Sequence, residues 1–460
     1  MLYIQDTIVA LATPPGVGAI GVIRLSGPHS FSILQKVFQG KTSPFNFESH
    51  KLYHGRIVDR ANIMLDDVLA VCMKAPQTFT GEECVEIQSH GSPVNISRII
   101  KLLISHGARL AEPGEFSKRA FLNGKIDLSQ AEALVDLIQA KSEIQAQNAL
   151  SQISGYLFEI IKDIRVKVAE SRALIEIGFD FSDQDLTIIE KANIISILES
   201  IYQKIDNLIG SFSAGQLLSH GVKIALVGKP NVGKSTLMNT LLKEDKSIIH
   251  HLPGTTRDVV SGELFIKGVP VYLYDTAGIR ETSDEVEKMG VQKSQEVLNQ
   301  SDCLLFLCDS SRVLDEYDQQ LWDLVKDKQF IVVMTKCDLP SAWSSFPFAA
   351  LSDDCLPVHI SVKNEWGLSD LMACIERKIF KDVHNYEHNY VLNNVRHYKS
   401  LQMAHQILGH VLEQFTKDQI QEECLVEELK SVSEHLGEIT GEINSETVLD
   451  VIFSKFCIGK

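Results

Sequence analysis

The spacing of apolar residues divides the chain into regions of different expected structure. Up to about residue 120, apolar residues form short runs or alternate with polar ones, which is typical of strands. The segments with this pattern are Thr7–Ala12, Ala19–Leu25, Tyr53–Val58, Val68–Met73 and Thr80–Gln88. A helix is expected over Pro93–Ser105, closed by Gly107 at its C′ position. The first region therefore predicts a domain that mixes strands and helices.

From Ser129 onwards the apolar period becomes that of helices. Ser129–Glu132 fits the S-x-x-E capping box that begins a helix. Apolar stripes with a spacing of three or four residues follow, and such stripes form cores or pair helices. They are Ile153, Leu157, Ile161, Ile164 and Val168; Ile194, Leu198, Ile201, Ile205 and Leu208; Leu401, Ala404, Leu408, Val411 and Phe415; and Leu425, Leu429, Val432, Leu436 and Ile439. Between Val222 and Ile379 the pattern returns to strands and loops.

The strand-like region begins with a phosphate-binding pattern. An apolar run at Ile224–Val227 predicts a buried parallel strand. Gly228–Ser235 follows and fits G-x-x-x-x-G-K-[ST], a loop whose backbone N–H groups converge on phosphate oxygens. Lys234 supplies a positive charge at the β- and γ-phosphates, and the Ser235 hydroxyl can ligate Mg²⁺. The next segment, with Leu237, Leu241 and Leu242, predicts a helix whose positive end faces the same anion.

Four further segments in the expected order indicate a GTPase. Gly254–Asp258 takes the place of a switch loop whose threonine completes the Mg²⁺ shell, and Asp275–Gly278 follows the strand-like run Val271–Tyr274. Thr335–Asp338 follows another strand, and its aspartate can accept both hydrogen bonds from guanine N1 and N2. Ser361–Lys363 matches a loop that supports the base. Thr335 replaces the usual asparagine of the guanine motif, so we expect guanine specificity with altered affinity.

The group that orients the attacking water is left open by these motifs. Ras-like enzymes place a glutamine after the Asp275–Gly278 segment, whereas this chain has Ile279, which cannot hydrogen-bond a water. The acidic segment just downstream contains Asp284, Glu285 and Glu287. The residues alone do not choose among these three, and a solvated acidic switch loop is an equal alternative.

Helical segments lie on both sides of this nucleotide-binding region. Neither helical part has a complete core alone, whereas together they can form a bundle. The expected fold is a P-loop GTPase domain with a mostly parallel sheet, inserted into a discontinuous helical domain and preceded by an α+β domain. The expected boundaries are 1–123, 124–217, 218–379 and 380–460.

Two features of the first domain have both structural and functional interpretations. Arg24 and Glu86 each lie in an otherwise apolar strand, and the plain explanation is an ion pair at the sheet edge. Glu112–Lys125 is a polar connection that contains glycine, the kind of loop that often carries function.

Composition narrows the class of protein and its partners. The chain has 460 residues with 44 basic and 60 acidic side chains, a formal charge of −16. A broad nucleic-acid-binding face usually needs a basic excess, so any RNA contact is expected to be local or supplied by a partner. The nine cysteines are scattered without a C-x-x-C pair, which predicts reduced thiols and a cytoplasmic location. No apolar run is long enough to span a bilayer, and we expect no signal peptide.

Together these segments resemble the MnmE (TrmE) family of tRNA-modification GTPases over essentially the whole chain. The resemblance is carried by Asp6–Gly27, Phe79–Gly91, Pro113–Ala133 and the GTPase segments. The terminal Phe456–Lys460, which reads FCIGK, is the most specific part because ordinary GTPases have no equivalent.

The resemblance implies an activity, cofactors and partners. The first domain would bind tetrahydrofolate and form a homodimer, and the chain would form a heterotetramer with MnmG, an FAD- and NADH-using protein. Together they would add a (carboxymethyl)aminomethyl group to C5 of the wobble uridine of certain tRNAs. The carbon would come from 5,10-methylene- or 5-formyl-tetrahydrofolate. GTP hydrolysis would require Mg²⁺ and K⁺, with K⁺ replacing an arginine finger.

The resemblance also assigns roles by matching positions. Glu287 would orient the water, Lys234 would act on the phosphates, and Cys457 is a candidate for covalent or redox help, with a buried thiol as the plainer alternative. Asn231, His250, Leu252 and Thr255 would hold K⁺; Ser235 and Thr256 would hold Mg²⁺; Arg24, Glu86, Lys125 and Lys460 would bind folate. The GTP contacts would be Asn231, Val232, Gly233, Lys234, Ser235, Thr236, His250, His251, Leu252, Pro253, Gly254, Thr255, Thr256, Asp275, Thr276, Ala277, Gly278, Thr335, Lys336, Asp338, Ser361, Val362 and Lys363.

Two other classes of protein compete with this reading. The first is a ribosome-assembly GTPase switch resembling Era or Der, without modification chemistry. Such proteins carry a basic RNA-binding module or a second GTPase domain, whereas this chain has one P-loop and an acidic end region. The second is a dimerising mechanical scaffold, which would leave the folate-type positions unexplained.

Overall fold

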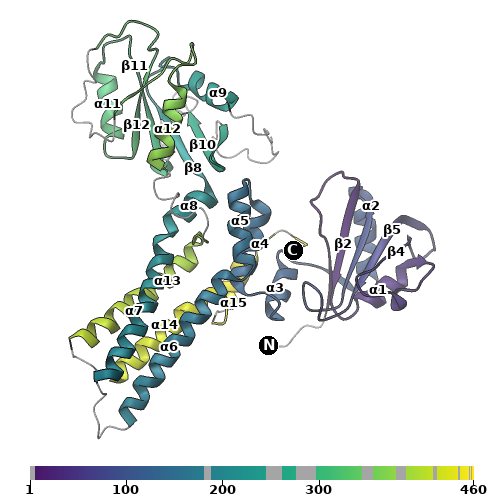
Figure 1. The fold of residues 1–460 in the computed structure, drawn as a ribbon. Coiled ribbons are helices and arrows are strands. Elements are labelled where there is room, and N and C mark those ends of the chain that lie inside the picture. Colours follow the sequence, from purple (N-terminus) through teal and green to yellow (C-terminus); the bar gives the residue numbers. More distant parts are fainter. Residues whose placement is uncertain are drawn as a thin grey trace. The chain divides into compact units, whose positions relative to one another are not determined.

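The computed structural model describes residues 6–180, 188–244, 262–275, 297–343, 356–379, 390–417, 422–443, 446–454, 456 and 458–459. The chain divides into two compact units, and Figure 1 labels their helices and strands. The first contains residues 1–138, 152–198 and 406–460, and the second contains residues 139–151 and 199–405. Each unit is therefore assembled from segments that are distant in the sequence.

The first unit contains a seven-stranded mixed sheet in the order β3-β4-β5-β6-β2-β1-β7. Only β1 and β7 pair in parallel, and the other neighbours are antiparallel. The strands are β1 (Thr7–Leu11), β2 (Ile20–Ser26), β3 (Phe38–Gly40), β4 (Leu52–Val58), β5 (Met64–Met73), β6 (Cys84–His90) and β7 (Ala108–Leu110). The five strands predicted from the apolar runs are confirmed, although β5 begins at Met64 instead of Val68, and β3 and β7 were not predicted. One further difference has a local cause.

That difference lies at the start of β6. The expected strand Thr80–Gln88 begins only at Cys84, because the preceding residues form a turn. The Thr80 hydroxyl lies 2.7 Å from the Ser26 hydroxyl, and Thr78 donates a hydrogen bond of 2.7 Å to the Glu82 carbonyl. Local side-chain hydrogen bonds of this kind favour turns over strands.

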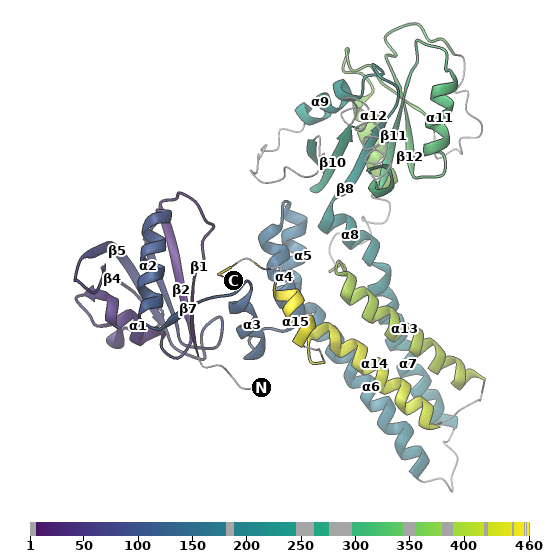
Figure 2. The same ribbon diagram turned by 180° about the vertical axis from the view of Figure 1, so that it is seen from behind.

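Two helices cover one face of this sheet (Figure 2). They are α1 (Ser30–Val37) and α2 (Pro93–Ser105), and a 3-10 turn covers Pro44–Asn46. Ile33 and Leu34 of α1 and Ile99 and Leu103 of α2 are buried in the core against the sheet. The predicted helix bounds are confirmed, and Gly107 has the positive φ of +109° expected at C′.

The polar segment 112–125 was expected to be a loop, and this expectation was wrong. It contains helix α3 (Glu115–Leu122), which begins after Gly114 in the left-handed conformation. Phe116 of α3 is fully buried in a small cluster with Ile8 and Ala10 of β1. The helix therefore forms because tertiary packing buries one aromatic residue of a mostly polar segment.

The expected capping box was placed two residues too late. Helix α4 (Leu128–Gln139) begins one residue before Ser129. The Asp127 carboxylate accepts hydrogen bonds from the Gln130 N–H at 3.1 Å and from the Ser129 hydroxyl at 2.6 Å. The Gln130 side-chain oxygen accepts in return from the Asp127 N–H at 2.9 Å. The reciprocal pair is thus D-x-x-Q, and Ser129 is buried inside it.

The predicted helical stripes are buried. Leu157, Ile161, Ile164 and Val168 of α6 are buried, but Ile153 ends the preceding helix and is only half-buried. The remaining helices are α5 (Glu143–Ile153), α6 (Tyr156–Asp180), α7 (Ile188–Gly210), α13 (Val395–Thr416), α14 (Glu422–Thr440) and α15 (Glu446–Phe453). Helices α6 and α14 pack side by side (Figures 1 and 2). Segments on both sides of residues 222–379 therefore share a core.

The second unit contains a six-stranded sheet in the order β13-β12-β11-β8-β10-β9. All neighbours pair in parallel except β9 with β10. The strands are β8 (Val222–Val227), β9 (Gly262–Ile266), β10 (Val269–Asp275), β11 (Cys303–Asp309), β12 (Phe330–Thr335) and β13 (Val358–His359). Helices α9 (Lys234–Glu244) and α12 (Leu368–Ile379) cover one face, and α11 (Glu316–Val325) covers the other. Helix α8 (Phe212–His220) precedes β8.

No helix in the described parts of the chain is both long enough and apolar enough to cross a membrane.

Candidate functional site

The predicted phosphate loop lies between β8 and α9, as the strand–loop–helix pattern requires. Strand β8 is central in the parallel sheet, between β11 and β10. Asn231 has a φ of +63° and Gly233 a φ of +106°, so the loop turns back before α9 begins. A side chain at Gly228 would lie 2.7 Å from the Leu307 carbonyl oxygen. Only glycine fits there, because β11 passes directly behind the loop.

The lysine of this loop is held by backbone carbonyls. Lys234 is 5% exposed, and its ammonium donates hydrogen bonds to the Gly228 carbonyl at 2.7 Å and the Lys229 carbonyl at 2.8 Å. These bonds satisfy part of the charge of a nearly buried ammonium. They also fix it within the loop, where an anion at the start of α9 meets the helix N-terminus.

The Mg²⁺-type residues lie next to the lysine. The Ser235 hydroxyl donates a hydrogen bond of 2.7 Å to the Asp275 carboxylate at the end of β10. Asp275 is 6% exposed, whereas Ser235 and Thr236 face solvent. A hydroxyl beside a carboxylate, both at the carboxyl edge of a parallel sheet, is an oxygen-rich pair of the kind that Mg²⁺ prefers.

Thr335 links the guanine-type motif to the phosphate loop. It is buried at the end of β12, and its hydroxyl lies 2.8 Å from the Val232 carbonyl and 3.2 Å from the Cys308 carbonyl. A hydroxyl has one hydrogen to donate, whereas an asparagine amide in that place has two. The threonine therefore keeps the link to the loop with one donor fewer.

Two further side-chain contacts hold the rest of the guanine-type motif in place. The Lys336 ammonium lies 2.6 Å from Asp309 at the end of β11, and Lys336 has a left-handed φ of +57°. Burial alone would raise the pKa of Asp309, but hydrogen bonds from Lys336 and Ser311 hold it below its ordinary value. The Ser361 hydroxyl donates a hydrogen bond of 2.8 Å to the exposed Asp338 carboxylate. Strands β11, β12 and β13 thus fix the loop that would meet the base.

The structure brings together the described residues predicted for the nucleotide. These are Asn231, Val232, Gly233, Lys234, Ser235, Thr236, Asp275, Thr335, Lys336, Asp338, Ser361, Val362 and Lys363. They lie at or just after the carboxyl ends of β8, β10, β12 and β13, which share one edge of the parallel sheet. The other predicted residues lie outside the described ones: His250, His251, Leu252, Pro253, Gly254, Thr255, Thr256, Thr276, Ala277, Gly278, Glu287, Cys457 and Lys460.

Arg24 and Glu86 form an ion pair, but not at a sheet edge. They face each other across β2 and β6, two inner strands, at 2.8 Å. Their side chains are 25% and 21% exposed, and the Arg24 guanidinium lies 5.9 Å from the Phe116 ring centre of α3. A charged pair on an inner, half-open sheet face can bind a polar, planar ligand by hydrogen bonding and stacking.

The chain end and Lys125 each contact the first domain, at different places. Gly459 packs so closely on the Leu11 carbonyl that a Cβ would lie 2.1 Å from it, and Ile458 bridges to Pro113. Leu11 directly follows Ala10, the cross-strand partner of Arg24. Lys125 is exposed, and its ammonium donates to the Pro76 carbonyl at 3.0 Å.

Three carboxylates around the nucleotide loops were not predicted from the sequence. Asp309 holds Lys336, and the α11 start, with Asp315 and Asp318, holds Lys229 of the phosphate loop. The D-x-x-D pattern at Asp315 could have indicated a helix start. Its contact with a loop more than 80 residues earlier follows only from the sheet order.

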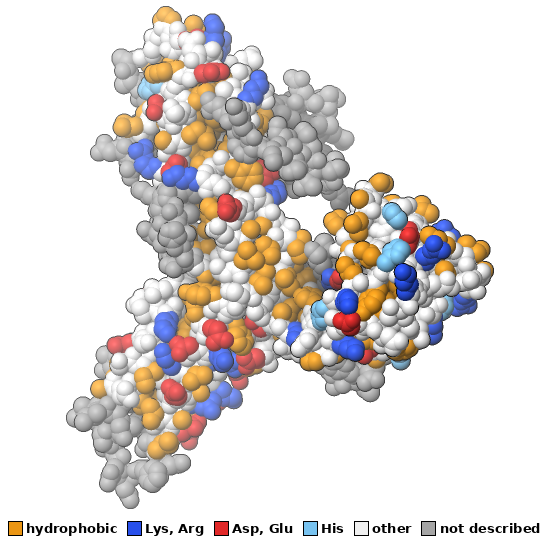
Figure 3. All heavy atoms as spheres, turned by 45° about the vertical axis from the view of Figure 1, so that its right-hand side comes forward, with side chains coloured by type: hydrophobic (Ala, Val, Ile, Leu, Met, Phe, Trp, Pro, Cys, Tyr) orange, Lys and Arg blue, Asp and Glu red, His pale blue; other side chains and the backbone are white. Residues whose placement is uncertain are grey.

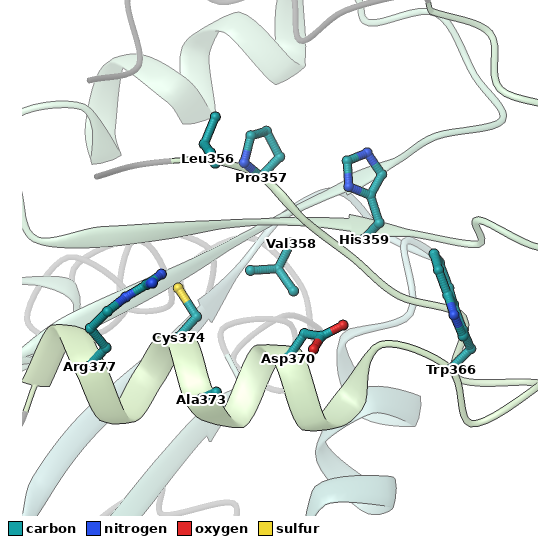
Figure 4. Close-up of a pocket in the computed structure, with 9 residues that line it drawn as sticks. All are labelled: Leu356, Pro357, Val358, His359, Trp366, Asp370, Ala373, Cys374 and Arg377. Carbon is teal, nitrogen blue, oxygen red and sulfur yellow. The ribbon is translucent and has the colours of Figure 1, made fainter. Parts of the chain in front are cut away.

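A separate pocket of about 510 Å³ lies at the β13 edge of the sheet (Figure 4). Its walls include His359 of β13, Trp366, and Asp370, Cys374 and Arg377 of α12. None of its lining residues belongs to the phosphate loop or the guanine-type motif, so it is not the nucleotide site.

Comparison with known families assigns nearly the whole chain. A family model described as the MnmE helical domain matches residues 128–457, and one described as the GTP-binding protein TrmE N-terminus matches residues 7–125.

Full-length relatives carry the same description. A protein of Thermoanaerobacter pseudethanolicus named tRNA modification GTPase MnmE is 39% identical over 458 residues, 99% of both chains. Proteins with this name from Natranaerobius thermophilus and Aquifex aeolicus are each 39% identical and cover 99% of this chain and 100% of their own. A crystal structure of Aquifex aeolicus Era matches 40% of this chain and 66% of its own at 25% identity, with a TM-score of 0.26, too low to argue from.

Proposed function

The chain belongs to the MnmE (TrmE) family of tRNA modification GTPases. From this membership we propose the details of its activity that are given below. It binds and hydrolyses GTP in the modification of tRNA. We propose that hydrolysis depends on K⁺ and Mg²⁺. We also propose that, with MnmG, the protein adds a (carboxymethyl)aminomethyl group to C5 of wobble uridines, with a tetrahydrofolate as one-carbon donor. A ribosome-assembly switch of the Era or Der type is set aside, because the MnmE relatives match over 99% of the chain.

The observation that carries the GTPase part is the shared sheet edge. The loops after β8, β10, β12 and β13 place a lysine, a serine–aspartate pair and the guanine-type aspartate along one edge. This is the edge at which doubly wound sheets bind their ligands. Asp338 would accept hydrogen bonds from guanine, Lys336 would cover the base, and Lys234 would lie at the phosphates.

The residues also fit the proposed ions. Ser235, with Thr256 outside the described part, would hold Mg²⁺, since the Ser235 hydroxyl lies beside Asp275 at the solvent-facing mouth of the loop. Asn231 is exposed, with the positive φ that turns the loop, and its amide oxygen would ligate K⁺ together with His250, Leu252 and Thr255. Bound cations there would neutralise charge that develops on the phosphates.

The first domain supports a folate site. Arg24 and Glu86 would bind the polar ring system, and Lys125 would meet the acidic part of the folate. Residues 458–459 pack beside the strand next to Arg24, and this supports the roles proposed for Cys457 and Lys460 in the folate reaction. Folate would supply the carbon, and this chain's residues would bind and orient it.

We propose the domain boundaries 1–123, 124–217, 218–379 and 380–460, a homodimer through the first domain, and a heterotetramer with MnmG in the cytoplasm. On the face shown in Figure 3, basic and acidic side chains are interspersed, so the described residues in view form no broad basic surface. With a net charge of −16, the chain would need MnmG to supply much of the tRNA contact.

The folate site is tested by replacing Arg24 with alanine. We expect 5-formyltetrahydrofolate to raise the melting temperature of the wild type by several degrees, because a ligand at ~100 times its Kd stabilises by ~2.7 kcal/mol. The R24A variant should show no shift, since Glu86 then has no guanidinium beside it. Arg56→Ala, at an exposed arginine of β4, is the matched control and should keep the shift. Equal shifts in wild type and R24A would contradict the assignment.

The modification itself is tested by nucleoside analysis of tRNA. Cells without this protein are expected to lose the aminomethyl-type group on wobble uridines, measured by mass spectrometry of digested tRNA. A plasmid that encodes the wild type should restore it, and one that encodes Arg24→Ala should not. Unchanged wobble uridines in the deletion strain would refute the proposed function.

A further inference from the structure

The second residue of the phosphate loop, Lys229, forms ion pairs with a neighbouring helix and is not free to contact the nucleotide. The motif leaves this position unspecified. The Lys229 ammonium lies 2.5 Å from Asp315 and 2.7 Å from Asp318. Its side chain is 26% exposed, and that of Asp318 is 9% exposed. Burial alone would lower the pKa of Lys229, but hydrogen bonds to both carboxylates raise it, so Lys229 keeps its positive charge.

The two carboxylates are themselves fixed by the start of α11. Asp315 is the N-cap, and its side chain accepts from the N–H groups of Tyr317 and Asp318. The Asp318 carboxylate accepts in return from the Asp315 N–H at 3.0 Å, which completes a capping box. Because these bonds set both side chains in place, the ammonium of Lys229 is bound by a preformed site at the start of α11.

The backbone of Lys229 connects this site to the reacting end of the loop. The Lys229 carbonyl accepts a hydrogen bond of 2.8 Å from the Lys234 ammonium, and the adjacent Gly228 carbonyl accepts another. A shift of Lys229 would therefore displace two acceptors that hold the phosphate-binding lysine. Contacts of this kind set geometry on which phosphoryl transfer depends strongly.

We propose that Asp315 and Asp318 act through Lys229 as positioning residues for Lys234. In this arrangement Lys229 is not a phosphate ligand, because two carboxylates more than neutralise its charge. The inference rests on the proposed GTPase function and deepens it. It gives the start of α11, which lies outside the GTPase motifs, a role in setting the rate of GTP hydrolysis.

The test compares full-length variants for GTP turnover, GTP affinity and melting temperature. Lys229→Met and Asp318→Asn should each lower kcat about tenfold at saturating GTP. The double variant should be no worse than either one, since both remove the same link. Lys229→Arg should restore turnover to within a few-fold of the wild type. Asp323→Asn, which removes an exposed carboxylate paired with Lys326 on the same helix, is the matched control and should leave kcat unchanged.

A merely structural role would lower the melting temperature of Asp318→Asn without changing kcat per active site, titrated with tightly bound nucleotide. That result, or independent losses that multiply in the double variant, would overturn the inference. Tighter GTP binding by Asp318→Asn at low salt would also overturn it, because Lys229 would then act as a phosphate ligand. A wild type without GTP turnover would refute the proposed function itself, whereas an active wild type with unaffected variants refutes only the positioning role.

Discussion

Replacing Lys234 by methionine is expected to lower kcat/KM for GTP by a factor of ~10²–10³, the usual loss when a fixed donor to developing negative charge is removed. Lys234 is nearly buried and held by two carbonyls, so it carries a charge that is already oriented before nucleotide binds. Methionine keeps the length of the side chain but neither charge nor donors. Steady-state GTP hydrolysis by the full-length protein measures the effect.

The control for this variant lies on the same helix. Lys243→Met changes an exposed lysine near the end of α9, away from the loop, and should keep kcat/KM within about twofold. If Lys243→Met lost as much activity as Lys234→Met, the loss would reflect general charge or helix stability rather than the phosphate position.

The local parts of the site could be predicted because the residues that form them are contiguous in the sequence. An apolar strand, a glycine loop and an amphipathic helix follow one another over 222–244, and the structure confirms all three. Backbone conformation in such a segment is set by residues within a few positions, so the pattern alone contains the information.

The contacts between loops could not be predicted in this way. Thr335 bonds to Val232 across about 100 positions, and Lys229 meets Asp318 across almost 90. These contacts exist because β8 lies next to β11 and β11 next to β12, an order that differs from the order in the chain. Apolar periodicity identifies strands but not their neighbours, so the residues that support the site remain hidden in the sequence.

The errors in the first unit have a related cause. The segment 112–125 was predicted to be a loop because most of its residues are polar. The buried Phe116, however, packs against Ile8 and Ala10 and stabilises α3. The capping box was misplaced because Ser129 fits the pattern as well as Asp127 does. Burial of Ser129 decides between them, and burial depends on the packing of the whole unit.

Changing Glu287 to alanine is expected to lower kcat by ~10²–10³ while GTP affinity stays within a few-fold of the wild type. Both Glu287 and Ile279 lie outside the described residues, so the argument is chemical. Isoleucine cannot hydrogen-bond a water, and family resemblance places a carboxylate in that role. The lost interaction exists only in the transition state, which lowers kcat without weakening binding.

A loss of kcat without a loss of GTP affinity distinguishes Glu287 from Lys234 and from its own acidic neighbours. Lys234→Met should weaken GTP binding as well as turnover, because its charge faces the phosphates in the ground state too. Glu285→Ala, in the same acidic segment, is the matched control and should retain turnover. If Glu285→Ala were inactive and Glu287→Ala active, the water-orienting role would belong to the other carboxylate. If Glu287→Ala lost binding in proportion to turnover, the residue would support the nucleotide site rather than the attacking water.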